Sequence, residues 1–196
     1  MPSLEEFNRK FFSDSRWLGK IIVGGLLTLS VVGMPLVLGY FYRYAEQIRL
    51  ENDLELPNWI RWEQLFVDGI KMFCIAAIFV LAPLAVILVF GWLLECLLGS
   101  WSGIFMLGMF SGFMVIVPPW CVAGILYFQR TFSLRSLLEW KTQQAISRMM
   151  VARSRSLLLP VLAYNGLLLV GAPVFVFVFF LGTNLLLAYL ILIFSK

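Results

Sequence analysis

Long runs of apolar residues constrain this chain more than any other feature of its sequence. Residues 72–98, 101–128 and 157–195 are apolar almost throughout. In hydrocarbon no outside group can bond to a backbone N–H or C=O, so such runs must form helices that satisfy their own backbone. Of the 196 residues, 61% are apolar and 13% are charged, whereas about a quarter are charged in a soluble domain. The sequence therefore predicts an all-α, polytopic membrane protein, with residues 1–196 forming a single membrane domain.

The N-terminal part is expected to begin at a membrane surface. Residues 1–20 fit an amphipathic helix that lies in the interface. Residues 21–42 follow as an apolar run that is long enough to span a bilayer as a straight helix. Gly33 and Pro35 interrupt this run, so it also fits a broken helix that re-enters on the side it came from. Both forms, spanning and re-entrant, are open at this point.

Residues 43–71 separate two apolar runs and contain many charges. The strip from Arg43 to Asn58 alternates acids and bases, so we expect it in water. Apolar side chains then recur on one helical face from Trp59 and Trp62 onward. This pattern predicts a second interfacial helix, anchored by two tryptophans.

Residues 72–98 and 101–128 predict a helical hairpin with a tight turn at Gly99 and Ser100. The spacing of Gly108 and Gly112 lets a neighbouring backbone approach closely. We expect this approach to come from another helix of the same chain, with a dimer contact as the alternative. Prolines are expected to kink both helices of the hairpin, at Pro83, Pro118 and Pro119.

Residues 130–156 form the most basic segment, and an apolar stripe along it predicts an interfacial helix over lipid headgroups. The following apolar run is nearly twice as long as one crossing needs. It divides naturally at Gly171 to Pro173. The prediction is a second hairpin, with helices over residues 157–170 and 173–195, which brings the number of spanning helices to four.

The placement of Lys and Arg predicts the orientation. Four lie in residues 1–20, four in 43–71, six in 130–155 and one at Lys196, whereas the two turns of the hairpins carry none. Positively charged loops favour the cytoplasm, so the neutral turns face outward and the C-terminus is cytoplasmic. If residues 21–42 are re-entrant, all 15 basic residues lie inside, and for this reason we favour the re-entrant form.

Three short motifs resemble the signature of an uncharacterised prokaryotic membrane family, catalogued as domain of unknown function number four thousand and thirteen. They are PLVLGY at 35–40, LPNW at 56–59 and FVDG at 66–69. The resemblance covers residues 17–72 and implies a multi-pass protein of a bacterial or archaeal cytoplasmic membrane. It brings no catalytic residues. We expect a structural role for its motif residues, which are Pro35, Gly39, Tyr40, Pro57, Trp59, Asp68 and Gly69.

The sequence contains few candidate residues for catalysis, metal binding or ion binding. There is no histidine, and the three cysteines are scattered through apolar runs, so we expect no metal, no cofactor and no enzyme. Glu95 is the one ionisable residue within a spanning segment, and it suggests an ion or proton site with Asn165 and Asn184. The alternatives are a carboxylate that reaches the interface and amides that hydrogen-bond between helices.

The function that the sequence favours is non-enzymatic: a membrane protein that organises lipids or protein partners, including copies of itself, through a basic cytoplasmic face. Nucleic acid is not expected as a partner, because the basic residues adjoin apolar segments. A small oligomeric channel, permease or lipid-moving protein is the alternative, with Gly33 and Pro35 lining the path. The candidate contacts for lipid headgroups or partners are Trp59, Trp62, Arg130, Arg135, Lys141, Arg148, Arg153 and Arg155.

Overall fold

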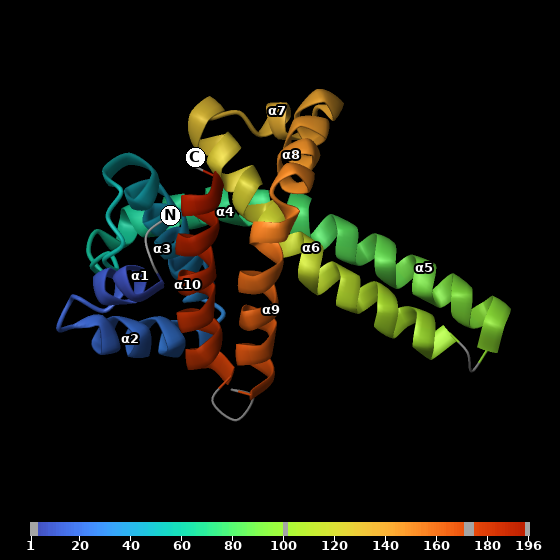
Figure 1. Cartoon of the computed structure of the whole chain (residues 1–196), viewed down its shortest axis with the longest axis horizontal. Helices are drawn as coiled ribbons and strands as arrows, with labels where there is room; N and C mark the ends of the chain where they lie inside the picture. Colours follow the sequence, from blue (N-terminus) through green and yellow to red (C-terminus); the bar gives the residue numbers. More distant parts are fainter. Residues whose placement is uncertain (1–3, 100–101, 171–174, 195–196) are drawn as a thin grey trace.

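A computed structural model describes residues 4–99, 102–170 and 175–194, and every regular element in these ranges is helical (Figure 1). The all-α prediction is confirmed for this part of the chain. In chain order the elements are α1 (Leu4–Phe11), α2 (Trp17–Leu29), α3 (Met34–Glu51), α4 (Trp62–Ala76), a π-helical turn η1 (Ala77–Leu81), α5 (Ala82–Leu98), α6 (Ser102–Thr131), α7 (Leu134–Leu138), α8 (Trp140–Ala152), α9 (Ser154–Val170) and α10 (Phe175–Phe194).

Three helices are long and apolar enough to cross a membrane: Trp62–Leu97, Gly103–Thr131 and Val176–Phe194. The first of them joins α4, η1 and α5 without interruption. The prediction of a separate interfacial helix over residues 59–71 is therefore wrong. Periodicity could not reveal this, because an amphipathic stretch and an apolar stretch continue each other at the same helical period.

The π-helical turn has a local cause in Pro83. Proline lacks an N–H, so the carbonyl of Phe79, four residues earlier, loses its α-helical donor. Widening the turn over Ala77–Leu81 accommodates this loss within a continuous helix. Phe79 itself is buried and packs edge-on against Trp120 of α6, with 5.8 Å between ring centroids.

The N-terminal apolar run is broken where Gly33 and Pro35 predict it. α2 ends at Leu29, and α3 begins at Met34 with Pro35 in its first turn, where proline loses no hydrogen bond. Gly33 is required in the connection, because a Cβ there would lie 2.2 Å from the carbonyl oxygen of Leu27. α2 crosses α10 closely, with Gly24 and Gly25 against aromatic rings of α10.

The core of the molecule is aromatic and lies between α3 and α10, with α1 packed against it. Tyr40, Tyr44, Phe11 and Phe180 are each completely buried there. Phe180 of α10 lies 5.4 Å, between ring centroids, from both Tyr40 and Phe41 of α3. We call α1–α4, residues 115–131 of α6 and α10 the body of the molecule.

The helical hairpin of α5 and the first half of α6 projects from the body as an arm (Figure 1). We define the arm as α5 together with residues 102–114 of α6. Its large side chains are mostly exposed, for example Trp92, Leu97 and Leu107. Gly108 and Gly112 meet no other part of the chain within 4 Å of an added Cβ. The predicted intramolecular approach at these two glycines is therefore wrong.

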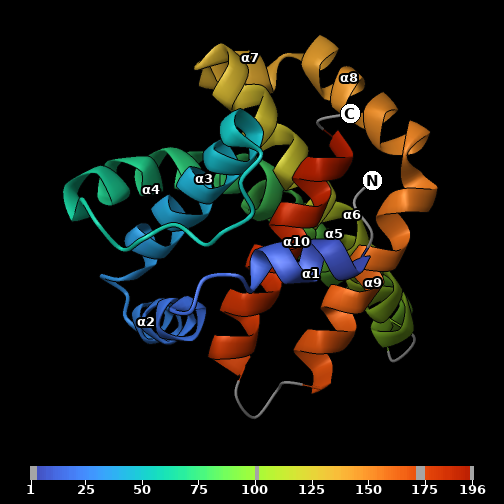
Figure 2. The same cartoon turned by 60° about the vertical axis from the view of Figure 1, so that its left-hand side comes forward.

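The basic segment is not the single helix predicted over residues 130–156. α6 continues through Thr131, two shorter helices α7 and α8 follow, and α9 already begins at Ser154. Phe132, with a φ of 50°, and the extended backbone of Ser133 and Glu139 interrupt the path. α9 and α10 then run side by side as the second hairpin (Figures 1 and 2). The predicted break at Gly171 to Pro173 lies outside the described residues.

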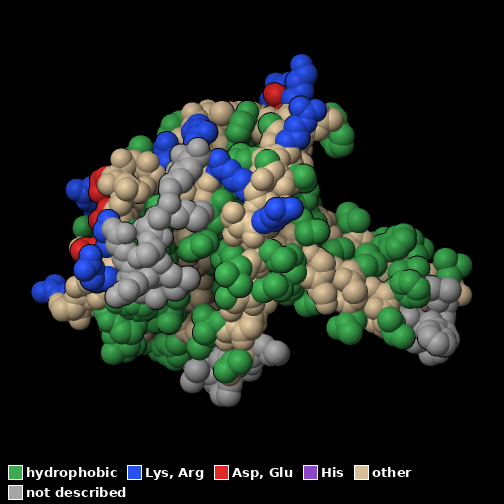
Figure 3. Space-filling view, in the orientation of Figure 1, with side chains coloured by type: hydrophobic (Ala, Val, Ile, Leu, Met, Phe, Trp, Pro, Cys, Tyr) green, Lys and Arg blue, Asp and Glu red, His purple; other side chains and the backbone are tan. Residues whose placement is uncertain are grey.

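Charged and apolar side chains are separated on the surface. Lys, Arg, Asp and Glu gather over the upper and left-hand parts of the view, whereas the arm and the lower part are covered by apolar side chains (Figure 3). Both hairpins point away from the charged end, since α5 ends and α6 begins at the far end of the arm, and α9 and α10 meet at the bottom (Figure 1). This end is called the charged end below.

Candidate functional site

The motif glycines lie where α3 crosses α4. A Cβ on Gly39 would lie 1.8 Å from the carbonyl oxygen of Leu65, and a Cβ on Gly69 would lie 1.8 Å from the carbonyl oxygen of Pro35. Two backbones can approach this closely only where both helices carry glycine. Pro35, Gly39 and Gly69 therefore fix one helix crossing, and this crossing positions the charged residues that follow on both helices.

Trp59 fixes the loop between α3 and α4 to the body. Its indole stacks on Tyr40 with 4.2 Å between ring centroids, and its Nε1 donates to the carbonyl oxygen of Lys20 at 3.1 Å. The ring of Trp59 thus packs against the interior of the body, and a contact of Trp59 with lipid headgroups stays a prediction. Trp62 stacks on Trp59 at 5.8 Å and remains 46% exposed.

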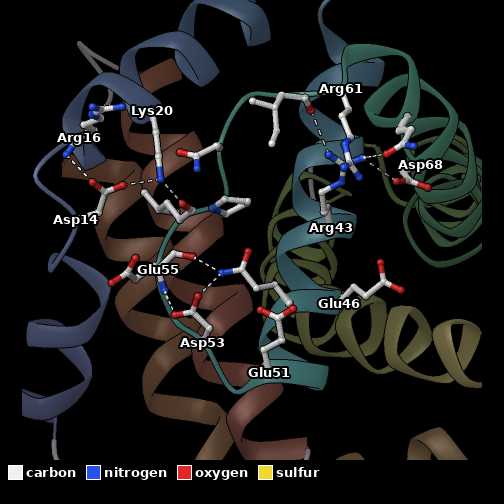
Figure 4. A pocket seen from close by; sticks show the side chains of 16 residues that line it. Asp14, Arg16, Lys20, Arg43, Glu46, Glu51, Asp53, Glu55, Arg61 and Asp68 are labelled. Carbon is white, nitrogen blue, oxygen red and sulfur yellow. Dashed lines mark hydrogen bonds and ion pairs between the residues drawn. The ribbon is translucent and has the colours of Figure 1, made fainter.

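Above this crossing lies a polar cleft of about 780 Å³, bounded by α2, α3, the loop over residues 52–61 and the start of α4 (Figure 4). We call it the polar cleft. The helix α2 brings Lys20 to one end of it, and α4 brings Gln64 and Asp68 to the other end. Pro57 lies buried in the wall between them.

At the first end, Lys20 is 8% exposed and forms an ion pair with Asp14 at 2.5 Å. Its Nζ also donates to the carbonyl oxygen of Leu56. The hydrogen bond from Lys20, together with the backbone N–H of Arg16, holds the pKa of the Asp14 carboxyl below its usual range. These contacts tie the beginning of α2 to the loop over residues 52–61.

At the second end, the guanidinium of Arg43 and the ammonium of Lys71 share one carboxylate, that of Asp68. Arg43 donates to the carbonyl oxygen of Ile60 at 3.2 Å and to Gln64 Oε1 at 3.3 Å, and it lies 3.7 Å from Asp68. The same carboxylate accepts a hydrogen bond from Lys71 at 2.8 Å. Arg61 lines the same end of the cleft (Figure 4), and within the described residues its guanidinium has neither an ion-pair partner nor a hydrogen-bond acceptor.

Along the opposite side of the cleft, four carboxylates have no cationic partner among the described residues: Glu46, Glu51, Asp53 and Glu55. Asp53 accepts from the side-chain amide of Gln47 at 2.8 Å, and Glu55 accepts from the hydroxyl of Ser13 at 3.0 Å. The cleft thus has two distinct chemical parts, a guanidinium pair at one end and carboxylates along one side.

The chemistry that the cleft offers comes from its charged side chains. The cleft offers charged groups but no paired nucleophile and base, and in the described part of the chain no three Cys, Asp or Glu side chains converge as a metal site requires. What the arrangement can do is recognise charge on a bound molecule.

The predicted basic contact residues lie mostly on the surface of α6 to α9. Five of the six are exposed: Arg130, Arg135, Lys141, Arg148 and Arg155. Arg153 instead is half-buried and donates to the carbonyl oxygen of Ile193 near the C-terminus of α10. A cation at this position satisfies a terminal carbonyl and interacts favourably with the helix dipole, so Arg153 is structural.

The residues of the predicted intramembrane polar site, Glu95, Asn165 and Asn184, do not form one site in the structure. Glu95 is exposed near the end of α5 in the arm. Asn165 donates to the carbonyl oxygens of Met114 at 3.3 Å and Val161 at 2.8 Å, and the buried Asn184 donates to its own helix at Phe180. The structure thus favours the alternative for Asn165, a hydrogen bond between helices.

Sequence reasoning missed the residues that close the cleft. Lys20 and Arg43 were read only as charges that set the orientation, since each borders an apolar run. Gln129 was also missed: it is 1% exposed, accepts from Arg49 at 3.1 Å and donates to the carbonyl oxygen of Tyr42. The one signal in the sequence was an acid, Asp14, six residues before a base, Lys20, where the apolar run begins. Such a pair indicates an ion pair at the membrane border.

Comparison with known proteins yields one match. A family model described as "Protein of unknown function (DUF4013)" matches residues 22–149. The match extends far beyond the region from 17 to 72 that carries the sequence motifs, through the arm and into α8. It includes Arg43, Arg61 and Asp68 of the cleft but begins after Lys20. No curated protein and no solved structure matches the chain.

Proposed function

This chain belongs to the DUF4013 family of proteins of unknown function, and from that premise we propose that it is a non-enzymatic, multi-pass membrane protein that organises lipids or protein partners at its charged end. The observation that carries the proposal is the separation of charged from apolar surface in Figure 3. Three helices suited to crossing a membrane extend from this end. Exposed cations beside them are placed to meet anionic headgroups or an acidic partner.

The proposed topology has four crossings, with α9 as the fourth beside the three longest helices. α9 has 17 residues, which reach about 25 Å at 1.5 Å per residue, slightly less than a hydrocarbon core of about 30 Å. The four crossings run outward and inward in turn over residues 72–98, 101–128, 157–170 and 173–195. The charged end and the C-terminus then face the cytoplasm of a prokaryote.

α2 is the re-entrant element in this topology. It has 13 residues and reaches only about 20 Å, too short to cross. The break before Pro35 lets α3 return to the charged end, and the body covers the interrupted backbone. All 15 basic residues then lie on one side.

A thiol reagent that cannot cross membranes tests this orientation. Cys96 is exposed near the end of the arm, so in a variant without Cys74 and Cys121 it should react from outside the cell. In a second variant without native cysteines, Ser15→Cys, at an exposed position before α2, should react only after the membrane is opened. Labelling of Ser15→Cys from outside would show that α2 is not re-entrant.

Transport, the alternative function, has less support. The path that it requires runs past Gly33 and Pro35, but the carbonyl oxygen of Pro35 lies directly against Gly69. The polar cleft does not reach Pro35. A closely packed interior at this point favours an organising role over a channel or permease.

Lipid that co-purifies with the protein tests the organising role. We expect anionic lipid to be enriched in wild type and to be lost when Arg135, Lys141 and Arg148 are changed to Gln, since each surface cation contributes about 1 kcal/mol near an anionic membrane. All three are exposed, so the fold should persist. A matched variant with Arg135→Lys and Arg148→Lys should retain the lipid. If wild type carries neither anionic lipid nor a protein partner, the proposed function fails.

A further inference from the structure

The polar cleft holds an excess of positive charge at one end. Arg43 and Arg61 both line this end (Figure 4), and Asp68, which pairs with Arg43, is also bonded to Lys71. Two guanidiniums at one end of a cleft repel each other unless an anion lies between or beside them. The planar guanidinium donors match the oxygens of a phosphate, so a phosphate is the anion that suits this end.

The carboxylate side of the cleft has the opposite excess. Glu46 and Glu51 have no ion pair and no hydrogen bond among the described residues, and Asp53 and Glu55 accept only from neutral donors. In Figure 4 these carboxylates follow one edge of the cleft that starts below the two arginines. A positively charged group bound there would find several carboxylate acceptors.

The surroundings of the cleft point to a lipid as the source of these charges. The two helices that border it, α2 and α4, also carry exposed apolar side chains. On α2 these include Leu18, Ile22 and Leu26, and on α4 they include Trp62, Phe66 and Ile70. A polar cleft bordered by two helices with exposed apolar faces suits the level at which headgroups meet acyl chains, with tryptophan at the border.

We propose that the polar cleft binds the headgroup of a zwitterionic phospholipid, with its phosphate at Arg43 and Arg61 and its primary ammonium at the carboxylates around Glu51. The cleft volume of about 780 Å³ lies within the usual range for ligand sites, about 300–1,000 Å³. This assignment rests on the proposed function, because it names one lipid that the charged end would organise.

A primary ammonium fits better than a quaternary one. It carries three N–H donors that the carboxylates can accept, whereas a trimethylated nitrogen carries none and is recognised by aromatic faces instead. The residues that line the cleft include no aromatic side chain. The cleft should therefore prefer an ethanolamine to a choline headgroup, and both to a glycerol headgroup, which lacks the cation.

Binding of short-chain, water-soluble phospholipids to the detergent-purified full chain tests the proposal. Calorimetry should give the order dihexanoyl phosphatidylethanolamine, then phosphatidylcholine, then phosphatidylglycerol. Free phosphoethanolamine, which has no acyl chains, should bind at least about tenfold more weakly than the lipid. Equal affinity for free phosphoethanolamine would overturn the assignment to a lipid, and tighter binding of phosphatidylglycerol would overturn the bipolar site.

Two variants locate the site. Arg61→Gln should weaken binding of phosphatidylethanolamine about tenfold, a difference of about 1.4 kcal/mol, while Glu51→Gln should remove most of the preference for ethanolamine over choline. Arg61 and Glu51 are exposed, so both variants should keep the melting temperature of wild type. Arg9→Gln removes the same charge from an exposed position of α1 outside the cleft and should leave binding unchanged.

The outcomes separate this site from the general role of the charged end. If Arg61→Gln binds as wild type does, or if Arg9→Gln weakens binding equally, the cleft is not the site. Co-purified anionic lipid that still depends on Arg135, Lys141 and Arg148 would then leave the proposed function in place without the cleft.

Discussion

The body and the arm are both helical and apolar, but different forces hold them. In the body, Tyr40, Tyr44 and Phe180 are completely buried by other helices of the same chain. In the arm, Trp92 and Leu107 remain 64% and 70% exposed. Lipid tails are as apolar as these side chains, so nothing drives the arm to fold back on the body. Its helices persist because each satisfies its own backbone.

This difference teaches where specificity resides. The body is shaped by contacts that depend on individual side chains, and the polar cleft lies on it. The arm depends on apolar character and length, with Gly91 against Met106 as its one close glycine contact in the described residues. Substitutions should therefore change the free energy of unfolding strongly in the body and weakly in the arm.

The largest effect is expected for Phe180→Ala. The ring of Phe180 lies within 6 Å of the ring centroids of Tyr40, Phe41 and Trp59, so its loss leaves a cavity that the surrounding rings cannot fill. The free energy of unfolding should fall by about 3–5 kcal/mol. Unfolding of the purified protein by a denaturing detergent, followed by near-ultraviolet circular dichroism, measures this.

Phe90→Ala is the matched change in the arm. Phe90 is 50% exposed, and removing its ring should lower the free energy of unfolding by less than about 1 kcal/mol. Equal losses for the two variants would show that the arm is packed as tightly as the body, for example by a second copy of the chain.

A somewhat smaller effect is expected for Gly39→Ala. The added methyl group would meet the carbonyl oxygen of Leu65 at 1.8 Å, so α3 and α4 must move apart. Overpacking of this kind costs about 1–3 kcal/mol, and the same detergent titration measures it. Gly108→Ala in the arm meets nothing within 4 Å. It should cost nothing, and a loss there would reveal a contact with another molecule.

Much of the backbone could be predicted from the sequence, because its determinants are local. The apolar runs predict the helices of both hairpins, and Gly33 with Pro35 predicts the break between α2 and α3. In each case the chemistry of a few neighbouring residues decides the outcome.

The faces of these helices could not be predicted, because an apolar side chain is equally stable against lipid or protein. Trp59 was expected at the surface but lies against Tyr40, and Gly108 was expected against a helix but faces outward. For the same reason hydropathy does not distinguish the arm from the body. The cleft depends on contacts between α2 and residues more than thirty positions later, such as Lys20 with Leu56, which no local pattern contains.

The smallest effect on the free energy of unfolding is expected when the pH is lowered, and only in the body. The pKa of Asp14 lies below its usual range because Lys20 and the backbone N–H of Arg16 stabilise the carboxylate. Asp14 in the unfolded chain has a pKa of about 3.9, so the ion pair stabilises the fold above about pH 4. This stabilisation is lost as the pH falls through the lowered pKa of the folded state.

Asp14→Asn should therefore lower the free energy of unfolding near neutral pH, by less than about 1 kcal/mol because the pair is partly exposed to solvent. The difference from wild type should shrink towards zero as the pH falls through the lowered pKa of the folded state, where the wild-type carboxylate binds its proton. Melting temperatures measured across this range provide the test. Glu95→Gln removes the same charge from the arm, where Glu95 is exposed, and its melting temperature should follow that of wild type at every pH. A difference for Glu95→Gln that also disappears in acid would mean that the arm, too, is held by a specific charge, and that the contrast between the two regions is one of degree.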